Sequence, residues 1–207
     1  MAGLELPLSP DGVEHRLDDG GRVLLRPIRA EDAEQLREGF QRLSERSRFL
    51  RFFTPMATLP DEWAARLTDL DHSTHRAWVA YDPDAADVAP PGLGVGVARL
   101  IELDDEPTAA EAAIAITDDN QGRGIGRLML EVVVGTAVAA GYETLVTNVL
   151  RENHRMLELV RGIGSLIRTT GDGPSVRIEV ALDDASDEQV VQGALYDLLR
   201  LAAGLNP

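Results

Sequence analysis

The stretch Glu111-Ala-Ala-Ile-Ala-Ile-Thr-Asp-Asp-Asn-Gln-Gly-Arg-Gly-Ile-Gly-Arg127 decides the fold of this chain. It opens as an apolar strand, passes through a glycine-rich turn and runs directly into a long apolar helix, expected over 126–140. Glycines in such a turn let successive backbone N–H groups converge on a phosphate, and the helix N-terminus adds a positive dipole. The residues alone therefore predict a phosphate-binding turn, with a tight glycine turn that binds no ligand as the alternative.

Two other phosphate-binding motifs fit this turn less well. A P-loop would continue with Gly-Lys-Ser or Gly-Lys-Thr after its second glycine, and the chain has neither there. The dinucleotide fingerprint G-x-G-x-x-G would place a third glycine where Arg127 stands. Arg123 and Arg127 instead supply positive charge for a pyrophosphate.

Patterns on both sides of the turn predict a mixed α/β domain. The expected strands are 22–26, 77–81, 94–102, 111–117, 144–150 and a hairpin of 165–170 with 176–182. The expected helices are 29–40, 45–53, one that starts at Pro60, 126–140 and 153–161. Ser44 is placed as an N-cap, and Gly141 as the glycine that ends the long apolar helix.

We expect three segments along the chain. Residues 1–20 form a polar leader, 21–183 form the domain, and 184–207 contain an amphipathic helix with apolar residues at helical spacing. This C-terminal helix is expected to pack back on the domain, with a contact in a homodimer as the alternative.

Charge and composition limit the classes of ligand, site and location that the protein can have. The formal net charge of −15 disfavours nucleic-acid partners and favours cationic ligands such as amines. The absence of cysteine excludes disulfides, thiolate nucleophiles and cysteine zinc sites. The N-terminus carries no secretory signal and no apolar stretch is long enough to span a bilayer, so we expect a cytoplasmic protein without a membrane partner.

The segment Gln121-Gly-Arg-Gly-Ile-Gly126 resembles the acetyl-CoA signature Q/R-x-x-G-x-G/A of the GNAT superfamily of N-acetyltransferases. The strand 144–150, followed by Asn153-His-Arg-Met156, resembles the downstream partner motif of that superfamily. Within it, the chain is similar to bacterial Pat-type protein lysine acetyltransferases in the segments 25–29, 43–53 and 118–124.

The resemblance implies the GNAT fold, a mixed and mostly antiparallel central sheet that splays between two central strands and is flanked by helices. Acetyl-CoA would be the cosubstrate, with its pantetheine arm in the splay. The backbone of Ile116 and Thr117 would bond the pantetheine amides, and Asn153 would touch the same arm. The other implied cofactor-binding residues are those of the turn, whose amides would hold the pyrophosphate: Gln121, Gly122, Arg123, Gly124, Ile125, Gly126 and Arg127.

Glu111 matches the position of the catalytic glutamate in Pat-type enzymes. An amine attacks a thioester only after it has lost a proton, and a carboxylate can accept that proton directly or through water. A strand amide near Ile116 would stabilise the oxyanion. The implied function is direct transfer of acetyl from acetyl-CoA to a primary amine, with a protein lysine as acceptor. A small-molecule amine is the alternative acceptor, and a weakly catalytic sensor of acetyl-CoA is the alternative function.

Two positions depart from the family pattern. Val160 stands seven residues after Asn153, where many GNAT enzymes have a tyrosine that protonates the departing CoA thiolate. Asn120 stands where Pat-type proteins commonly have a tryptophan. The thiolate must therefore take its proton from water or another group, or catalysis is weak.

Two further patterns are interpreted as structural. The D-x-D-H-x-x-H segment 69–75 carries metal-ligating residue types, but its spacing fits no standard zinc motif, so no metal is expected. The glycines of 92–96 are not followed by a helix, which indicates a bulged strand or one that another segment approaches closely.

Overall fold

The computed structural model describes residues 11–86, 88, 91–163 and 166–182. The described chain divides into two compact units. Residues 11–99 and 114–129 form what we call the N-terminal unit, and residues 100–113 and 130–182 form the C-terminal unit.

The strands are β1 (Val13–Arg16), β2 (Arg22–Pro27), β3 (His75–Asp82), β4 (Leu93–Glu102), β5 (Ala109–Ile116), β6 (Thr144–Leu150), β7 (Leu166–Thr170) and β8 (Ser175–Ala181). The helices are α1 (Ala33–Gln41), α2 (Glu45–Phe52), α3 (Asp61–Thr68), α4 (Ile125–Ala139) and α5 (His154–Arg161), with short 3-10 turns η1 (Ala30–Asp32) and η2 (Asp118–Asn120). Hydrogen bonds join the strands in the order β1-β2-β3-β4-β5-β6-β8-β7. Because β5 and β6 run parallel while the pairs β1–β2, β2–β3, β6–β8 and β7–β8 run antiparallel, the predicted mixed, mostly antiparallel sheet is confirmed.

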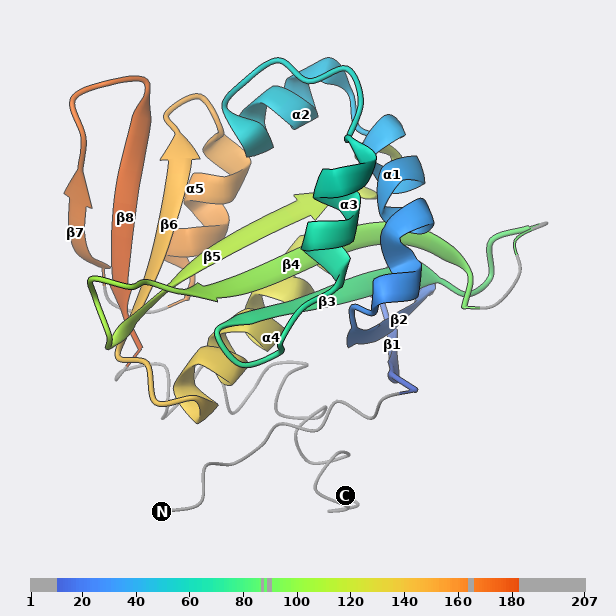
Figure 1. Ribbon diagram of the computed structural model, residues 1–207, viewed down its shortest axis with the longest axis horizontal. Coiled ribbons are helices and arrows are strands. Elements are labelled where there is room, and N and C mark those ends of the chain that lie inside the picture. Colours follow the sequence, from blue (N-terminus) through green and yellow to red (C-terminus); the bar gives the residue numbers. More distant parts are fainter. Residues whose placement is uncertain (1–10, 87, 89–90, 164–165, 183–207) are drawn as a thin grey trace. The chain divides into compact units, whose positions relative to one another are not determined.

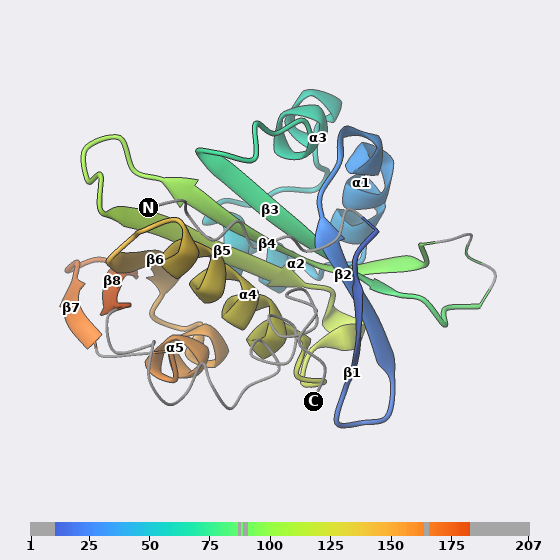
Figure 2. The same ribbon diagram turned by 90° about the horizontal axis from the view of Figure 1, so that it is seen from below.

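In the N-terminal unit, β1 and β2 form a hairpin, seen at its full length in Figure 2, and β2 pairs with β3. Helices α1 and α3 lie side by side (Figure 1). Apolar side chains of this unit gather in two buried clusters. One comes mainly from β3 and contains Ile28, Ala77, Val79 and Tyr81; the other comes from the helices and their connections and contains Phe40, Leu43, Leu59 and Ala64.

In the C-terminal unit, β6 pairs with β8 along its whole length, from Thr144 to Leu150. Its pairing with β5 is much shorter: it begins at Ala109 opposite Thr144 and ends at Glu111 opposite Val146. Strand β5 nevertheless continues to Ile116 and β6 to Leu150. The parallel ladder therefore stops at Glu111, as a sheet that splays between these two strands requires.

Helix α4 ends as the sequence predicts. Gly141 has a φ of +86°, a conformation that glycine adopts without the steric cost of a Cβ. Its N–H donates to the Val138 carbonyl at 3.0 Å, and the Tyr142 N–H donates to the Ala137 carbonyl at 3.0 Å. These bonds satisfy carbonyls that the end of a helix leaves open.

Two local features differ from the sequence expectation. Part of the predicted leader is a strand, because Val13–Arg16 pairs with β2. This strand alternates only between half-buried and exposed residues, so it lacks the apolar face that marks a strand in a sequence. The helix expected over 29–40 begins with η1 before α1.

Residues 1–10 of the leader and the predicted helix within 184–207 lie outside the described residues, so the three-segment division and the homodimer contact stay predictions. Within the described part of the chain, every helix is too short or too polar to cross a lipid bilayer.

Candidate active site

The glycine-rich turn adopts the backbone that its sequence predicts. Gly122 and Gly124 have φ values of +82° and +87°, in the left-handed region that disfavours residues with a Cβ. A Cβ built on either glycine would meet no atom within 4 Å. These glycines are therefore needed for the path of the backbone and not for close packing, and the turn faces open space.

Helix α4 starts directly after this turn, at Ile125. The Leu128 N–H donates to the Gly124 carbonyl at 3.1 Å. The N–H groups of the helix residues before Leu128 therefore have no carbonyl partner within α4. The first turn of α4 contains no acidic residue that could compete for these donors. Ile125 is 1% exposed and fixes the helix start against the core. This arrangement suits an anion.

Gln121 ties the turn back to the end of β5. Its Nε2 donates to the Ile116 carbonyl at 3.1 Å and lies 3.4 Å from the Ser47 hydroxyl of α2. Thr117 is buried, with its N–H bonded to the Val95 carbonyl at 2.9 Å and its own carbonyl bonded to the Asn120 N–H at 2.9 Å. The strand end that the resemblance assigns to pantetheine is thus held in place by several internal bonds.

Arg123, whose charge the sequence assigns to a pyrophosphate, has partners within the protein, and its role toward a pyrophosphate stays a prediction. Its Nε donates to Asp19 at 2.7 Å and its Nη1 donates to the Asn120 side chain at 2.6 Å, with Asp82 3.8 Å away. The hydrogen bond from Arg123 is the largest of the effects that lower the pKa of Asp19. Arg123 therefore joins the turn to the β1–β2 hairpin in this structure. Arg127 is exposed in the first turn of α4.

Asp118 is a structural residue of the turn that the sequence reasoning missed. Its carboxylate accepts hydrogen bonds from the Ser44 N–H at 2.8 Å, from the Ser44 hydroxyl at 2.7 Å and from the Ser47 hydroxyl at 2.9 Å. Ser44 also caps α2 as predicted, since its hydroxyl accepts from the Ser47 N–H at 3.1 Å. Asp118 thereby fastens the start of α2 to the segment that leads into the glycine turn.

Glu111 belongs to the C-terminal unit, at the last pair of the β5–β6 ladder. Its half-buried side chain accepts a long hydrogen bond, 3.4 Å, from Asn148 Nδ2. Asn148 lies two residues beyond Val146, the ladder partner of Glu111, so the two side chains are diagonal neighbours. Asn148 was missed from the sequence, although an asparagine within a run of β-branched and apolar residues was a readable signal.

Asn153 and Val160 also lie in the C-terminal unit. Asn153 caps α5, because its side-chain oxygen accepts from the Met156 N–H at 3.2 Å. Val160 is 2% exposed and packs in the core. The predicted site residues thus fall into two groups: Glu111 and Asn153 in the C-terminal unit, and Ile116, Thr117 and the turn from Gln121 to Arg127 in the N-terminal unit.

The segment 69–75 has a structural role. Asp71 accepts hydrogen bonds from the N–H groups of Ser73, Thr74 and His75 and from the Thr74 hydroxyl, which lower the pKa of its carboxyl. Among the residues that the structure describes, no three acidic, histidine or cysteine side chains gather as metal ligands would. The glycines at the start of β4 are closely approached, as expected: a Cβ on Gly96 would lie 2.6 Å from Ile116 Cδ1.

Comparisons with known proteins agree with this geometry. Residues 22–165 match the family model of the acetyltransferase (GNAT) domain. The acetyltransferase PA5475 of Pseudomonas aeruginosa is 29% identical over 148 residues, which make up 72% of this chain and 77% of that protein. The acetyltransferase Pat of Mycolicibacterium smegmatis is 26% identical over 145 residues, 69% of this chain but only 40% of that longer protein.

Among solved structures, the GNAT domain of S. lividans PAT is similar, with a TM-score of 0.72 and 26% identity over 82% of this chain and 96% of that one. The family model covers well over half of the chain, including the glycine turn and the strand end before it. The chain therefore belongs to the GNAT acetyltransferase family and is an N-acetyltransferase that takes its acetyl group from acetyl-CoA.

Proposed function

We propose that the acetyl acceptor is the side-chain amine of a protein lysine and that Glu111 is the general base. The observation that carries the proposal is the place of Glu111 at the point where the β5–β6 ladder stops, with Asn148 Nδ2 directed at its carboxylate. The similarity to Pat proteins supports the lysine acceptor.

The reaction then follows from elementary chemistry. Glu111 accepts a proton from the acceptor ammonium group, directly or through water, which frees the nitrogen lone pair. The nitrogen attacks the thioester carbonyl carbon, and an amide of the β5 end near Ile116 stabilises the oxyanion. The attacking nitrogen loses its second proton to water, the C–S bond breaks and CoA leaves as a thiolate. Because Val160 is apolar and 2% exposed, the thiolate takes its proton from water or from another group.

The turn binds the other end of the cosubstrate. The amides from Gly122 to Arg127 would hold the pyrophosphate at the start of α4, where the structure leaves helix N–H donors and open space. Pantetheine would bond to the backbone of Ile116 and Thr117, and Asn153 would touch it. The Ile116 carbonyl, which already accepts from Gln121, retains a second lone pair for such a bond.

The test is Glu111→Gln, assayed with acetyl-CoA and a panel of lysine peptides. We expect kcat to fall by roughly 100-fold or more, the usual contribution of a general base, while the Kd for acetyl-CoA stays unchanged. Glu158→Gln, at an exposed position of α5, is the control and should keep full activity. Unchanged turnover of Glu111→Gln would exclude Glu111 as the general base. The lysine acceptor would be overturned if the enzyme acetylated a small amine and none of the lysine peptides.

A further inference from the structure

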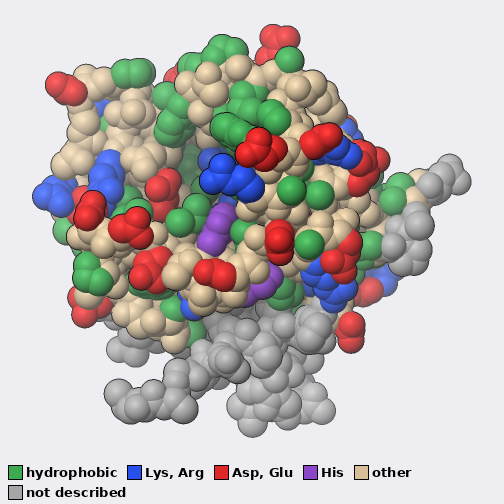
Figure 3. Space-filling model, in the orientation of Figure 1, with side chains coloured by type: hydrophobic (Ala, Val, Ile, Leu, Met, Phe, Trp, Pro, Cys, Tyr) green, Lys and Arg blue, Asp and Glu red, His purple; other side chains and the backbone are tan. Residues whose placement is uncertain are grey.

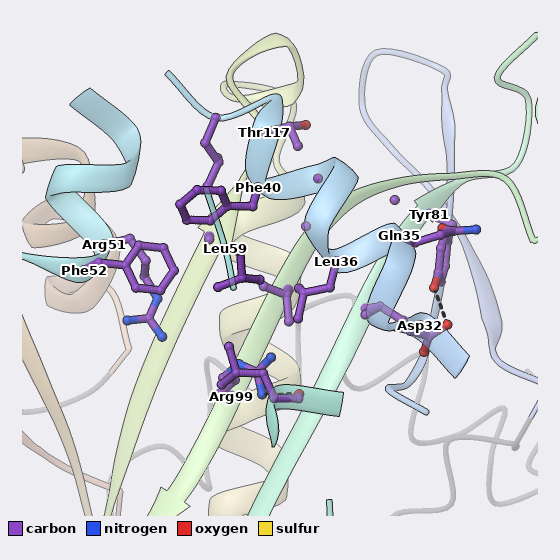
Figure 4. A pocket seen from close by; sticks show the side chains of 18 residues that line it. Asp32, Gln35, Leu36, Phe40, Arg51, Phe52, Leu59, Tyr81, Arg99 and Thr117 are labelled. Atoms are coloured by element: carbon purple, nitrogen blue, oxygen red, sulfur yellow. Dashed lines mark hydrogen bonds between the residues drawn. The ribbon is translucent and has the colours of Figure 1, made fainter. Parts of the chain in front are cut away.

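The N-terminal unit contains a cavity of about 90 Å³, and most of the residues that line it have no part in the acetyl transfer proposed above. Figure 4 shows side chains of α1, α2, β3 and β4 around it. Most of its wall is apolar and includes Leu36, Phe40, Phe52, Leu59, Leu67 and Val97. Thr117, at the end of β5, also lines it, next to the segment that leads into the glycine turn.

One cation is buried in this apolar wall. The Arg99 side chain comes from β4, and the residue is only 3% exposed. Its Nη1 donates to the Leu67 carbonyl at 2.8 Å and lies 3.3 Å from His75 Nε2. Its Nη2 is buried without any hydrogen-bond partner. Burial lowers the pKa of its guanidinium to about 9, and no acidic side chain of the described residues is among the groups that shift it.

A second polar group of the wall is also left open. Gln35, on α1, has a buried side-chain oxygen without a partner, close to Gly94. The neighbouring Asp32 and Tyr81 differ, because they are bonded to each other at 2.9 Å (Figure 4). Both are also bonded to Arg26. The cavity therefore presents one unmatched cationic donor, Arg99 Nη2, and one unmatched amide oxygen, Gln35 Oε1.

A buried charge without a partner is costly, and proteins keep one mainly where a ligand or an ion completes it. We propose that this cavity binds a small carboxylate with a hydrocarbon body, whose carboxylate accepts from Arg99 and whose hydrocarbon part lies against the apolar wall. The apolar wall favours a carboxylate with a hydrocarbon chain over a phosphate or an inorganic anion, which would leave the wall uncovered. The proposal does not depend on the lysine acceptor or on Glu111.

The experiment measures binding to the full chain by calorimetry and thermal shift, with 4-methylpentanoate, its amide and leucine as probes. We expect the carboxylate to bind saturably and its amide at least tenfold more weakly, because only the carboxylate pairs with the guanidinium. Arg99→Met should weaken carboxylate binding by about 10- to 100-fold. Arg37→Met is the control, since Arg37 is a half-buried arginine of α1 that pairs with Glu34 and Asp61 and does not line the cavity.

A purely structural Arg99 would give a different result. If Arg99 only ties β4 to Leu67, Arg99→Met should lower the melting temperature and leave carboxylate binding unchanged, which would overturn the proposal. The proposal would also be overturned if the wild-type chain did not bind the carboxylate at millimolar concentration, or if it bound the acid and the amide equally well. Both of these tests use the wild-type chain, so they hold even if Arg99→Met does not fold. Leucine distinguishes two roles for a carboxylate bound in the cavity. If the enzyme acetylates leucine, the ligand of the cavity is an acceptor; if leucine binds without being acetylated, the ligand is an effector.

Discussion

At the scale of single residues, the buried pair of Arg26 and Asp32 distinguishes the N-terminal unit. Both residues are 5% exposed, and two hydrogen bonds of 2.6 and 2.8 Å join them. Tyr81 donates to the same carboxylate at 2.9 Å, and so does the Arg29 N–H at 2.7 Å. Each lone pair of this carboxylate is thus directed at a donor, which a buried ion pair needs in order to be stable.

Asp32→Ala should therefore destabilise the chain strongly. It leaves the Arg26 guanidinium buried without its partner, and breaking such a pair costs about 3–5 kcal/mol. The measurement is the free energy of unfolding from urea titrations. Asp84→Ala is the control, because Asp84 pairs with Arg22 at the surface, where both side chains are well exposed. An exposed pair contributes about 1 kcal/mol or less, so equal losses in the two variants would contradict the structural interpretation.

At the scale of elements, the turn between β5 and α4 combines two functions of glycine. The positive φ of Gly124 sets the path of the chain, and the lack of a side chain leaves room at the helix N-terminus. Gly141, at the other end of α4, has nearly the same φ and the same open surroundings. The two glycines differ only in the end of the helix that they flank.

Gly124→Glu should abolish acetyl-CoA binding, because it places a carboxylate where we propose that the pyrophosphate lies. Gly141→Glu adds the same charge at the same backbone conformation, so it should lose a similar stability, about 1–2 kcal/mol, and keep its affinity for acetyl-CoA. Calorimetric titration of acetyl-CoA, with melting temperatures of both variants, makes the comparison. Acetyl-CoA that still binds to Gly124→Glu would exclude the turn as the pyrophosphate site.

At the scale of the whole molecule, the net negative charge comes from many carboxylates that lie apart from one another. Figure 3 shows them scattered over one face and not gathered in a single patch. Several have a lowered pKa because they accept hydrogen bonds from arginine, serine or backbone donors: Asp19, Asp32, Asp84, Asp118 and Glu179. For Asp32 and Asp118, burial acts in the opposite direction and is the largest single effect, but the hydrogen bonds together outweigh it.

These shifts predict acid unfolding with a definite sign. A carboxyl whose pKa is lower in the folded chain stabilises that chain fully above its unfolded pKa of about 4, and this contribution disappears as the pH falls toward the folded pKa. We expect the free energy of unfolding to fall steeply below about pH 4. The variant Asp32→Asn should show a shallower fall, as measured by urea titrations between pH 7 and pH 3. An equally steep fall in the variant would show that Asp32 does not contribute to the pH dependence of the free energy of unfolding.

Local sequence was sufficient wherever neighbours in the chain determine the structure. The cap at Ser44, the end of α4 at Gly141 and the strand–turn–helix order around Gln121 were all predicted and are confirmed. Strand β1 was not predicted, because an edge strand without an apolar face leaves no periodic pattern. The splay between β5 and β6 followed from the family resemblance, since no local pattern shows where a ladder stops.

The sequence by itself thus determined the class of fold and the glycine turn at the start of α4, and its family resemblance marked Glu111 as the candidate base, which stays a prediction. Only the tertiary structure decided that Arg123 pairs with Asp19, that Asp118 holds the start of α2, and that Arg99 is buried with an open donor in an apolar cavity. The physical reason is the range of the interactions. Caps, turns and periodic faces depend on residues a few positions apart, whereas the partner of a charged side chain is chosen by whichever distant segment the fold brings beside it.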